Sequence, residues 1–193
     1  MNLPNKLSLL RIFMIPIMVV FYFLDFPCAP LISAIIFILA SATDFLDGYI
    51  ARKYNMVTDL GKLLDPIADK MLVMFALFMV VESNTLPIIF ASVCCAIIVS
   101  RELLISAIRQ IAAAKGSVIM ANKFGKIKTI FQDIALPVLL LLKMKDALIS
   151  ISQTFYDCIY YIGLVTFIIA TLLTIISGIV YIVQNKGVFA SND

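Results

Sequence analysis

The sequence contains no histidine, and only 14% of its 193 residues are charged. The absence of histidine removes the commonest general base and the commonest ligand of transition metals. Acid–base chemistry in this chain must therefore use carboxylates, lysine or tyrosine. The cysteines show no C-x-x-C spacing, and we interpret them as small apolar packing residues without a redox role. They are Cys28, Cys94, Cys95 and Cys158.

Hydrophobic residues are abundant, at 63% of the chain, and the mean hydropathy is +1.08. A soluble domain of this length would be far less apolar. These values indicate an all-α integral membrane protein. Neither a soluble domain nor a clear internal repeat is evident, so we expect residues 1–193 to form a single transmembrane domain. The net charge is only +3, and we expect no nucleic-acid partner.

Apolar runs predict six transmembrane helices. They cover about residues 9–24, 31–50, 59–81, 86–114, 123–142 and 154–183. Residues 1–8 are expected to form a short interfacial segment instead of a signal peptide, because no A-x-A cleavage site follows the first run. Arg11 near the start of that run is expected to extend its charge to the lipid head groups.

The positions of lysine and arginine predict the orientation in the membrane. They concentrate in the N-terminus, the 51–62 connection, residues 109–128 and the C-terminal tail, while the opposite turns hold Lys143 and Lys145. Because cytoplasmic loops carry an excess of these residues, both termini and the acidic motif described next should face the cytoplasm. We therefore expect a multi-pass protein of the cell membrane. Five spans would put the tail outside and are less favoured.

Acidic residues occur where the sequence otherwise indicates membrane helices. At about 100° per residue, small and acidic residues share an arc of roughly 100° on the second expected helix and roughly 80° on the third. Carboxylates that face one another in a low-dielectric setting repel unless cations lie between them, and hard divalent ions prefer oxygen ligands. This pattern predicts a two-metal site for phosphate chemistry. The residues are Asp44, Asp47, Gly48 and Ala51, then Gly61, Asp65 and Asp69.

The spacing of these residues resembles the complete signature of the CDP-alcohol phosphatidyltransferase family. It reads Asp44-x-x-Asp47-Gly48-x-x-Ala51-Arg52, then eight residues, then Gly61-x-x-x-Asp65-x-x-x-Asp69. Eight fixed residues over 26 positions make a specific pattern. The resemblance implies six transmembrane helices, usually a homodimer, and displacement of CMP from a CDP-linked lipid by an alcohol.

The same resemblance implies roles for individual residues. Asp44, Asp47, Asp65 and Asp69 would hold two divalent ions, Mg²⁺ or Mn²⁺, which neutralise charge on the diphosphate and on the leaving CMP. Asp69 would also take the proton from the acceptor hydroxyl, which attacks the phosphorus that bears diacylglycerol. The CDP-lipid would be bound by Asp47, Gly48, Ala51, Arg52, Thr58, Gly61 and Lys62.

A wider similarity points to one subgroup of the family. Residues 2–11, 64–70, 100–109 and 125–129 resemble the enzymes that join CDP-diacylglycerol to sn-glycerol 3-phosphate. Arginine and lysine bind phosphate well, and the expected phosphate-binding residues are Arg101, Arg109, Lys126 and Lys128. Alternatively, Arg101 is balanced by its neighbour Glu102, and the other three are ordinary cytoplasmic-side cations that bind anionic lipid.

Other functions stay open at this point. Within the family, the acceptor could be inositol phosphate, serine or phosphatidylglycerol, although the basic cluster favours a phosphorylated acceptor. A cation transporter could also place acidic residues near a cavity, but it would not require Gly48, Ala51, Arg52 and Gly61 at these intervals. A purely structural membrane protein would not tolerate four inward-facing unpaired aspartates.

Overall fold

The computed structural model describes the backbone of residues 3–53, 59–114 and 123–184. It also describes their side chains, apart from residues 3–4, 45–53, 59–64, 113–114 and 123. In these segments all regular structure is helical. The helices are α1 (Leu3–Phe23), α2 (Ala29–Lys53), α3 (Asp59–Glu82), α4 (Ile88–Ala114), α5 (Lys123–Leu141), α6 (Lys145–Ile151) and α7 (Gln153–Gln184), with a 3-10 turn at Leu142–Met144.

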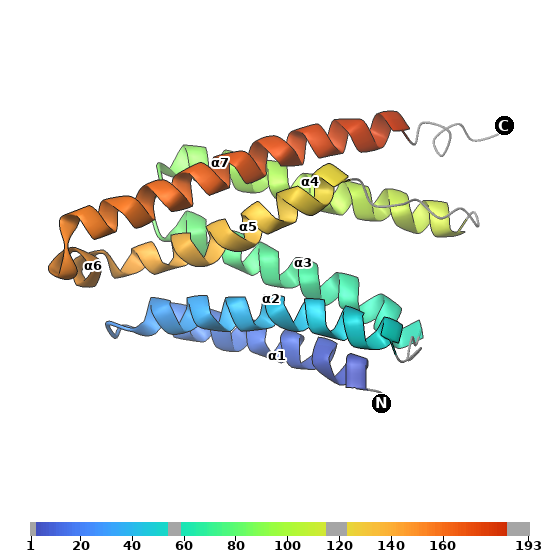
Figure 1. Cartoon of the computed structure of the whole chain (residues 1–193), viewed down its shortest axis with the longest axis horizontal. Helices are drawn as coiled ribbons and strands as arrows, with labels where there is room; N and C mark the ends of the chain where they lie inside the picture. The colour runs from blue at the N-terminus through green and yellow to red at the C-terminus, as the bar shows by residue number, and fades with distance from the viewer. Residues whose placement is uncertain (1–2, 54–58, 115–122, 185–193) are drawn as a thin grey trace.

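The six long helices run along the length of the molecule, and α6 lies at one end (Figure 1). At the opposite end, which we call the polar end, α1, α3 and α5 begin and α2, α4 and α7 finish. The connections at residues 24–28 and 83–87 lie near α6, at what we call the far end. The start of α1 and the finish of α7 therefore lie on the same side of the bundle.

Two sets of helix contacts are the most extensive in the bundle. α1 packs on α2 and α3, and α5 packs along α7. The second contact depends on Gly163 of α7, where a Cβ atom would lie only 2.9 Å from Cδ2 of Leu139 on α5. In the first set, the buried Tyr22 hydroxyl of α1 donates to the carbonyl of Met79 on α3 at 2.9 Å. Such a bond offsets the cost of burying a polar group.

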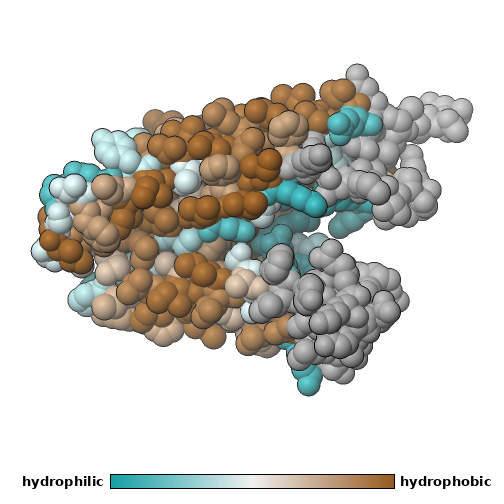
Figure 2. Space-filling model, in the orientation of Figure 1, coloured by the Kyte–Doolittle hydropathy of each residue, from teal (hydrophilic) through white to brown (hydrophobic). Residues whose placement is uncertain are grey.

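Large apolar side chains cover the outside of the bundle. Phe13, Phe78 and Ile89 are 64%, 61% and 78% exposed. Figure 2 shows hydrophobic surface over most of the described face, and hydrophilic surface within a hollow at the polar end. Exposed apolar area of this extent is typical of a surface that contacts lipid.

Three helical stretches in the described part of the chain are long and apolar enough to cross a membrane. They are Asn5–Phe23, Ile88–Ala112 and Gln153–Gln184. The apolar stretch of α2, Ala29–Asp44, is shorter, and the first turns of α3 and α5 carry several charged residues. The fold therefore supports a helical membrane protein, while the number of six spans stays a prediction.

The helix bounds agree with the expected spans to within a few residues, with two differences. Residues 3–8 form no separate interfacial segment in the structure, because α1 is continuous from Leu3 and buries Asn5 and Ser8. The connection between the last two long helices contains the short helix α6. A seven-residue helix shows too little periodicity for its sequence to stand out.

Candidate active site

Asp44 on α2 is held by an arginine of α1. Nη1 of Arg11 lies 2.6 Å from Oδ1 of Asp44, and Nε of Arg11 donates to the carbonyl of Ala40 at 3.1 Å. The Arg11 side chain is fully buried, whereas 45% of the Asp44 side chain is exposed. The expectation that Arg11 reaches the lipid head groups is therefore wrong, because a carboxylate one helix away compensates its buried charge.

Asp65 on α3 is held by the same helix. The Ser8 hydroxyl donates to Oδ1 of Asp65. Ser8 and Arg11 are three residues apart, so they lie on the same face of α1. That face positions one carboxylate of α2 and one of α3. The sequence signal for this role was two polar residues at helical spacing within an apolar run.

Asp69 lies one turn beyond Asp65 on α3 and lines a pocket. The empty space in and around the pocket, open solvent included, is about 380 Å³. Its described lining residues are Asp69, Lys70, Val73 and Met74 of α3, Ile98, Val99 and Glu102 of α4, and Lys128, Thr129 and Gln132 of α5. The Asp69 side chain is exposed, and the negative charges of Asp44, Glu102 and Asp133 are close enough to act on it. Crowded carboxylates of this kind favour a bound cation.

The opposite wall of the pocket carries a buried ion-pair cluster. Lys128, which is 2% exposed, donates to Oε1 of Glu102, and Nη1 of Arg101 lies 3.2 Å from the same oxygen. The two cations therefore share one carboxylate oxygen, and the negative charges of Asp69 and Asp133 also act on Lys128. Lys70, Thr129 and Gln132 also line the pocket and were not predicted from the sequence as site residues.

Arg101 is placed behind this wall. Two glycines make room for it: a Cβ at Gly125 would lie 3.3 Å from Nη2, and a Cβ at Gly178 would lie 3.3 Å from Cγ. Arg101 is not one of the described residues that line the pocket. The alternative interpretation, in which Glu102 balances Arg101, agrees with this geometry.

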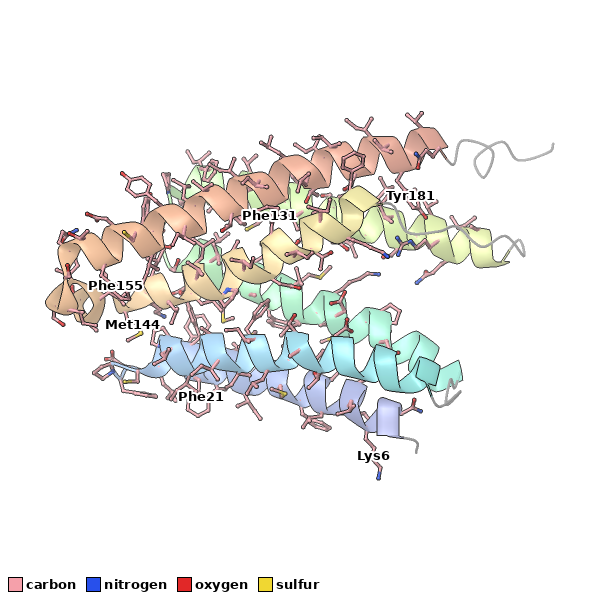
Figure 3. The ribbon with its side chains drawn as sticks, in the orientation of Figure 1. Lys6, Phe21, Phe131, Met144, Phe155 and Tyr181 are labelled. Atoms are coloured by element: carbon pink, nitrogen blue, oxygen red, sulfur yellow. The ribbon has the colours of Figure 1, made fainter. Side chains whose placement is uncertain are left out.

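The remaining two predicted phosphate-binding residues lie on the exposed surface. The Arg109 guanidinium lies 5.6 Å from the ring centroid of Tyr181, and both Arg109 and Lys126 are exposed. Figure 3 shows Tyr181 on α7 near the polar end. Of the four predicted residues, the structure brings Lys128 into the described pocket with Asp69, whereas the other three lie outside its lining.

A sequence model of the CDP-alcohol phosphatidyltransferase family matches residues 1–184. The chain belongs to this family. Three relatives share the name CDP-diacylglycerol–glycerol-3-phosphate 3-phosphatidyltransferase. The protein of Bacillus subtilis (strain 168) is 40% identical over 196 residues and covers 95% of both chains, and that of Rickettsia bellii (strain RML369-C) is 37% identical over 188 residues, or 97% of both. The Salmonella choleraesuis (strain SC-B67) protein is 36% identical over 193 residues, or 96% of both chains.

Membership confirms the resemblance drawn from the family signature, but part of that signature lies outside the described side chains. The structure shows that α2 continues to Lys53 and that α3 begins at Asp59, so the expected helices are present. The undescribed positions include most of the predicted CDP-lipid-binding set. They are Asp47, Gly48, Ala51, Arg52, Thr58, Gly61 and Lys62.

The chemistry of the described carboxylates fits a hard divalent ion. Asp44 and Asp65 contribute Oδ1 to their partners on α1, and Asp69 lies one turn from Asp65 with its charge acting together with that of Asp44. All are oxygen ligands, which Mg²⁺ and Mn²⁺ prefer. Among the side chains that are described, no group of three or more carboxylates, cysteines or histidines forms a metal site, and Asp47 is not among them.

Proposed function

We propose that this phosphatidyltransferase transfers the phosphatidyl group of CDP-diacylglycerol to sn-glycerol 3-phosphate, giving phosphatidylglycerophosphate and CMP. The observation that carries the proposal is one pocket in which Asp69 of the family signature and the buried cation Lys128 both line the wall. The pocket thus combines a proton acceptor with a group that attracts a phosphate. The names of the relatives support these two substrates.

The protein is proposed to be a single domain, residues 1–193, that crosses the cell membrane six times. The long helices contain 19 to 32 residues, which corresponds to about 29 to 48 Å at the rise of an α-helix. A hydrocarbon core is about 30 Å thick. The distribution of lysine and arginine favours a cytoplasmic polar end with both termini on that side. The family resemblance further favours a homodimer.

A pair of divalent ions, Mg²⁺ or Mn²⁺, completes the proposed site. Asp44, Asp47, Asp65 and Asp69 would hold them, with Ser8 and Arg11 fixing the orientation of two of these carboxylates. When bound, the ions neutralise charge on the diphosphate and on the leaving CMP. The CDP-lipid is proposed to bind beside them, at the residues of the signature that the sequence analysis assigned to it.

In the proposed reaction, Asp69 takes the proton of an acceptor hydroxyl. The hydroxyl oxygen then forms a bond to the phosphorus that bears diacylglycerol, the bond from that phosphorus to the CMP oxygen breaks, and CMP leaves with the electron pair. Asp69 is suited to this role because its exposed carboxylate lies in the pocket that Lys128 also lines. A positioned base typically contributes about 10²- to 10⁴-fold in rate.

Lys128 is proposed to bind the phosphate of the acceptor. Lys128 lines the pocket and shares Glu102 with Arg101, so Arg101 can keep Glu102 paired when Lys128 binds a phosphate. Arg101 acts behind it as a positioning residue through the shared oxygen of Glu102. Arg109 and Lys126, which are exposed near the polar end, are proposed to attract anionic substrates to the pocket.

The test is CMP release by the purified protein in detergent, with CDP-diacylglycerol and Mg²⁺ or Mn²⁺. Glycerol 3-phosphate, inositol phosphate, serine and phosphatidylglycerol are compared as acceptors. We expect release that depends on glycerol 3-phosphate and ceases when the metal is chelated. Release that depends on another acceptor would keep the family chemistry and overturn the assigned substrate. The absence of release with any acceptor would overturn the proposed reaction.

A further inference from the structure

Gln132 on α5 is a buried polar residue whose bonding within the chain is incomplete. It is 1% exposed, and in the described part of the chain its side-chain Oε1 has no hydrogen-bond partner. A buried amide oxygen without a partner destabilises a protein, and the great majority of such groups are bonded. Because Gln132 lines the pocket that contains Asp69 and Lys128, a bound molecule can supply the missing donor.

The position of Gln132 relative to Lys128 suits a short phosphorylated alcohol. The two residues are four apart on α5, so they lie on the same face and are displaced by about 6 Å along the helix axis. A three-carbon chain that carries a phosphate at one end can place its phosphate at Lys128 and a hydroxyl at Gln132. Asp69, on α3 in the same pocket, receives the remaining hydroxyl.

The charge of the pocket explains why an amide is suitable at this position. Glu102 already accepts bonds from Lys128 and Arg101, and Asp69 is assigned to the reacting hydroxyl. Another carboxylate beside a bound phosphate would repel it. The amide oxygen of Gln132 accepts a hydrogen bond from a hydroxyl without adding negative charge.

We propose that Gln132 is a specificity-determining residue, whose Oε1 accepts a hydrogen bond from the non-reacting C2 hydroxyl of the acceptor. This inference rests on the proposed function. It assigns the three polar groups of glycerol 3-phosphate to three residues of one pocket: the phosphate to Lys128, the C2 hydroxyl to Gln132 and the C1 hydroxyl to Asp69. A pocket that binds a substrate hydroxyl in this way should reject an analogue that lacks it.

The experiment compares glycerol 3-phosphate with 3-hydroxypropyl phosphate, which keeps the phosphate and the reacting hydroxyl and lacks only the C2 hydroxyl. For the unaltered protein we expect kcat/KM for CMP release to be about 10- to 100-fold higher with glycerol 3-phosphate. Gln132→Met removes the amide and preserves side-chain length. It should reduce this preference to less than about threefold, mainly by raising the KM for glycerol 3-phosphate.

A matched control is the same substitution at the far end of the bundle. Gln153 is exposed on α7 and donates to Asp157 at 2.9 Å, away from the pocket. Gln153→Met should keep both the preference between acceptors and the KM for CDP-diacylglycerol. Equal loss of the preference in the two variants would mean that the effect is not specific to the pocket.

Thermal unfolding without substrate separates this proposal from a structural role of Gln132. Because Oε1 has no partner in the described residues, Gln132→Met should leave the Tm unchanged or raise it. A lower Tm together with an unchanged acceptor preference would show that Gln132 is a structural residue. A wild-type protein that releases CMP with both acceptors equally well would overturn the inference while leaving the proposed function intact. The absence of wild-type release with glycerol 3-phosphate would overturn both.

Discussion

The two sides of the site use charge differently. On the side formed by α1, α2 and α3, which we call the acidic wall, the carboxylates Asp44, Asp65 and Asp69 outnumber the cations Arg11 and Lys70, and Arg11 holds Asp44. On the side formed by α4 and α5, the cations Lys128 and Arg101 share the carboxylate Glu102, and Asp133 adds a second negative charge nearby. Carboxylates are therefore in excess on one side, whereas on the other side a carboxylate fixes the position of two cations. This arrangement suits a reaction in which metal ions and a phosphate must bind beside each other.

The largest effect should come from the acidic wall at Asp69. Asp69→Asn keeps the shape of the side chain and removes its ability to take a proton, so CMP release should fall by about 10³-fold or more. The protein should still be recovered from the membrane as a monodisperse species in detergent. Activity within tenfold of wild type would show that Asp69 is not the base of the reaction.

A smaller loss of activity is expected when Arg11, the cation that holds Asp44, is replaced. Arg11→Leu removes the buried partner of Asp44, and CMP release should fall by about 10- to 100-fold, with a higher metal concentration needed for half-maximal activity. Because 45% of the Asp44 side chain is exposed, water can solvate the carboxylate that remains, so the Tm should fall only modestly.

The control for Arg11 is Lys6→Leu on the same helix. Lys6 is exposed and points away from the bundle near the polar end (Figure 3). We expect its replacement to leave the metal dependence unchanged. Similar effects of the two substitutions would show that α1 contributes general charge and does not hold Asp44 specifically.

The smallest loss of activity should come from replacing Ser8, the neutral residue that holds Asp65. Ser8→Ala removes one hydrogen bond to Asp65, and a bond to a charged group contributes about 1.5 to 3 kcal/mol. Water can replace much of this bond because the Asp65 side chain is partly exposed. CMP release should fall by about three- to tenfold, and Ser8→Thr should restore most of it. If CMP release fell more in Ser8→Ala than in Arg11→Leu, Ser8 and not Arg11 would be the main support of the acidic wall.

The sequence was sufficient to predict the helices and the acidic face, because both depend on local periodicity. The expected start at residue 59 and the expected finish at residue 114 coincide with the bounds of α3 and α4. Asp65 and Asp69 lie on one face of α3 because four residues make about one turn.

Features that depend on contacts between helices could not be predicted in this way. Arg11 was assigned to the membrane surface because its partner Asp44 is 33 residues away in the sequence. The pairing of Lys128 with Glu102 joins residues 26 positions apart. Gln132 gave no local signal, because a neutral amide in an apolar run acquires its significance from the pocket that α3, α4 and α5 form together.

The most direct test of the account is acceptor saturation in Lys128→Met, because the central claim is that Lys128 binds the phosphate of the acceptor. The account predicts a KM for glycerol 3-phosphate at least tenfold higher, with little change in the KM for CDP-diacylglycerol. Lys145→Met, the same substitution at an exposed far-end position, should leave both values unchanged. An unchanged acceptor KM in Lys128→Met would contradict the account, because Lys128 would then serve only to balance Glu102.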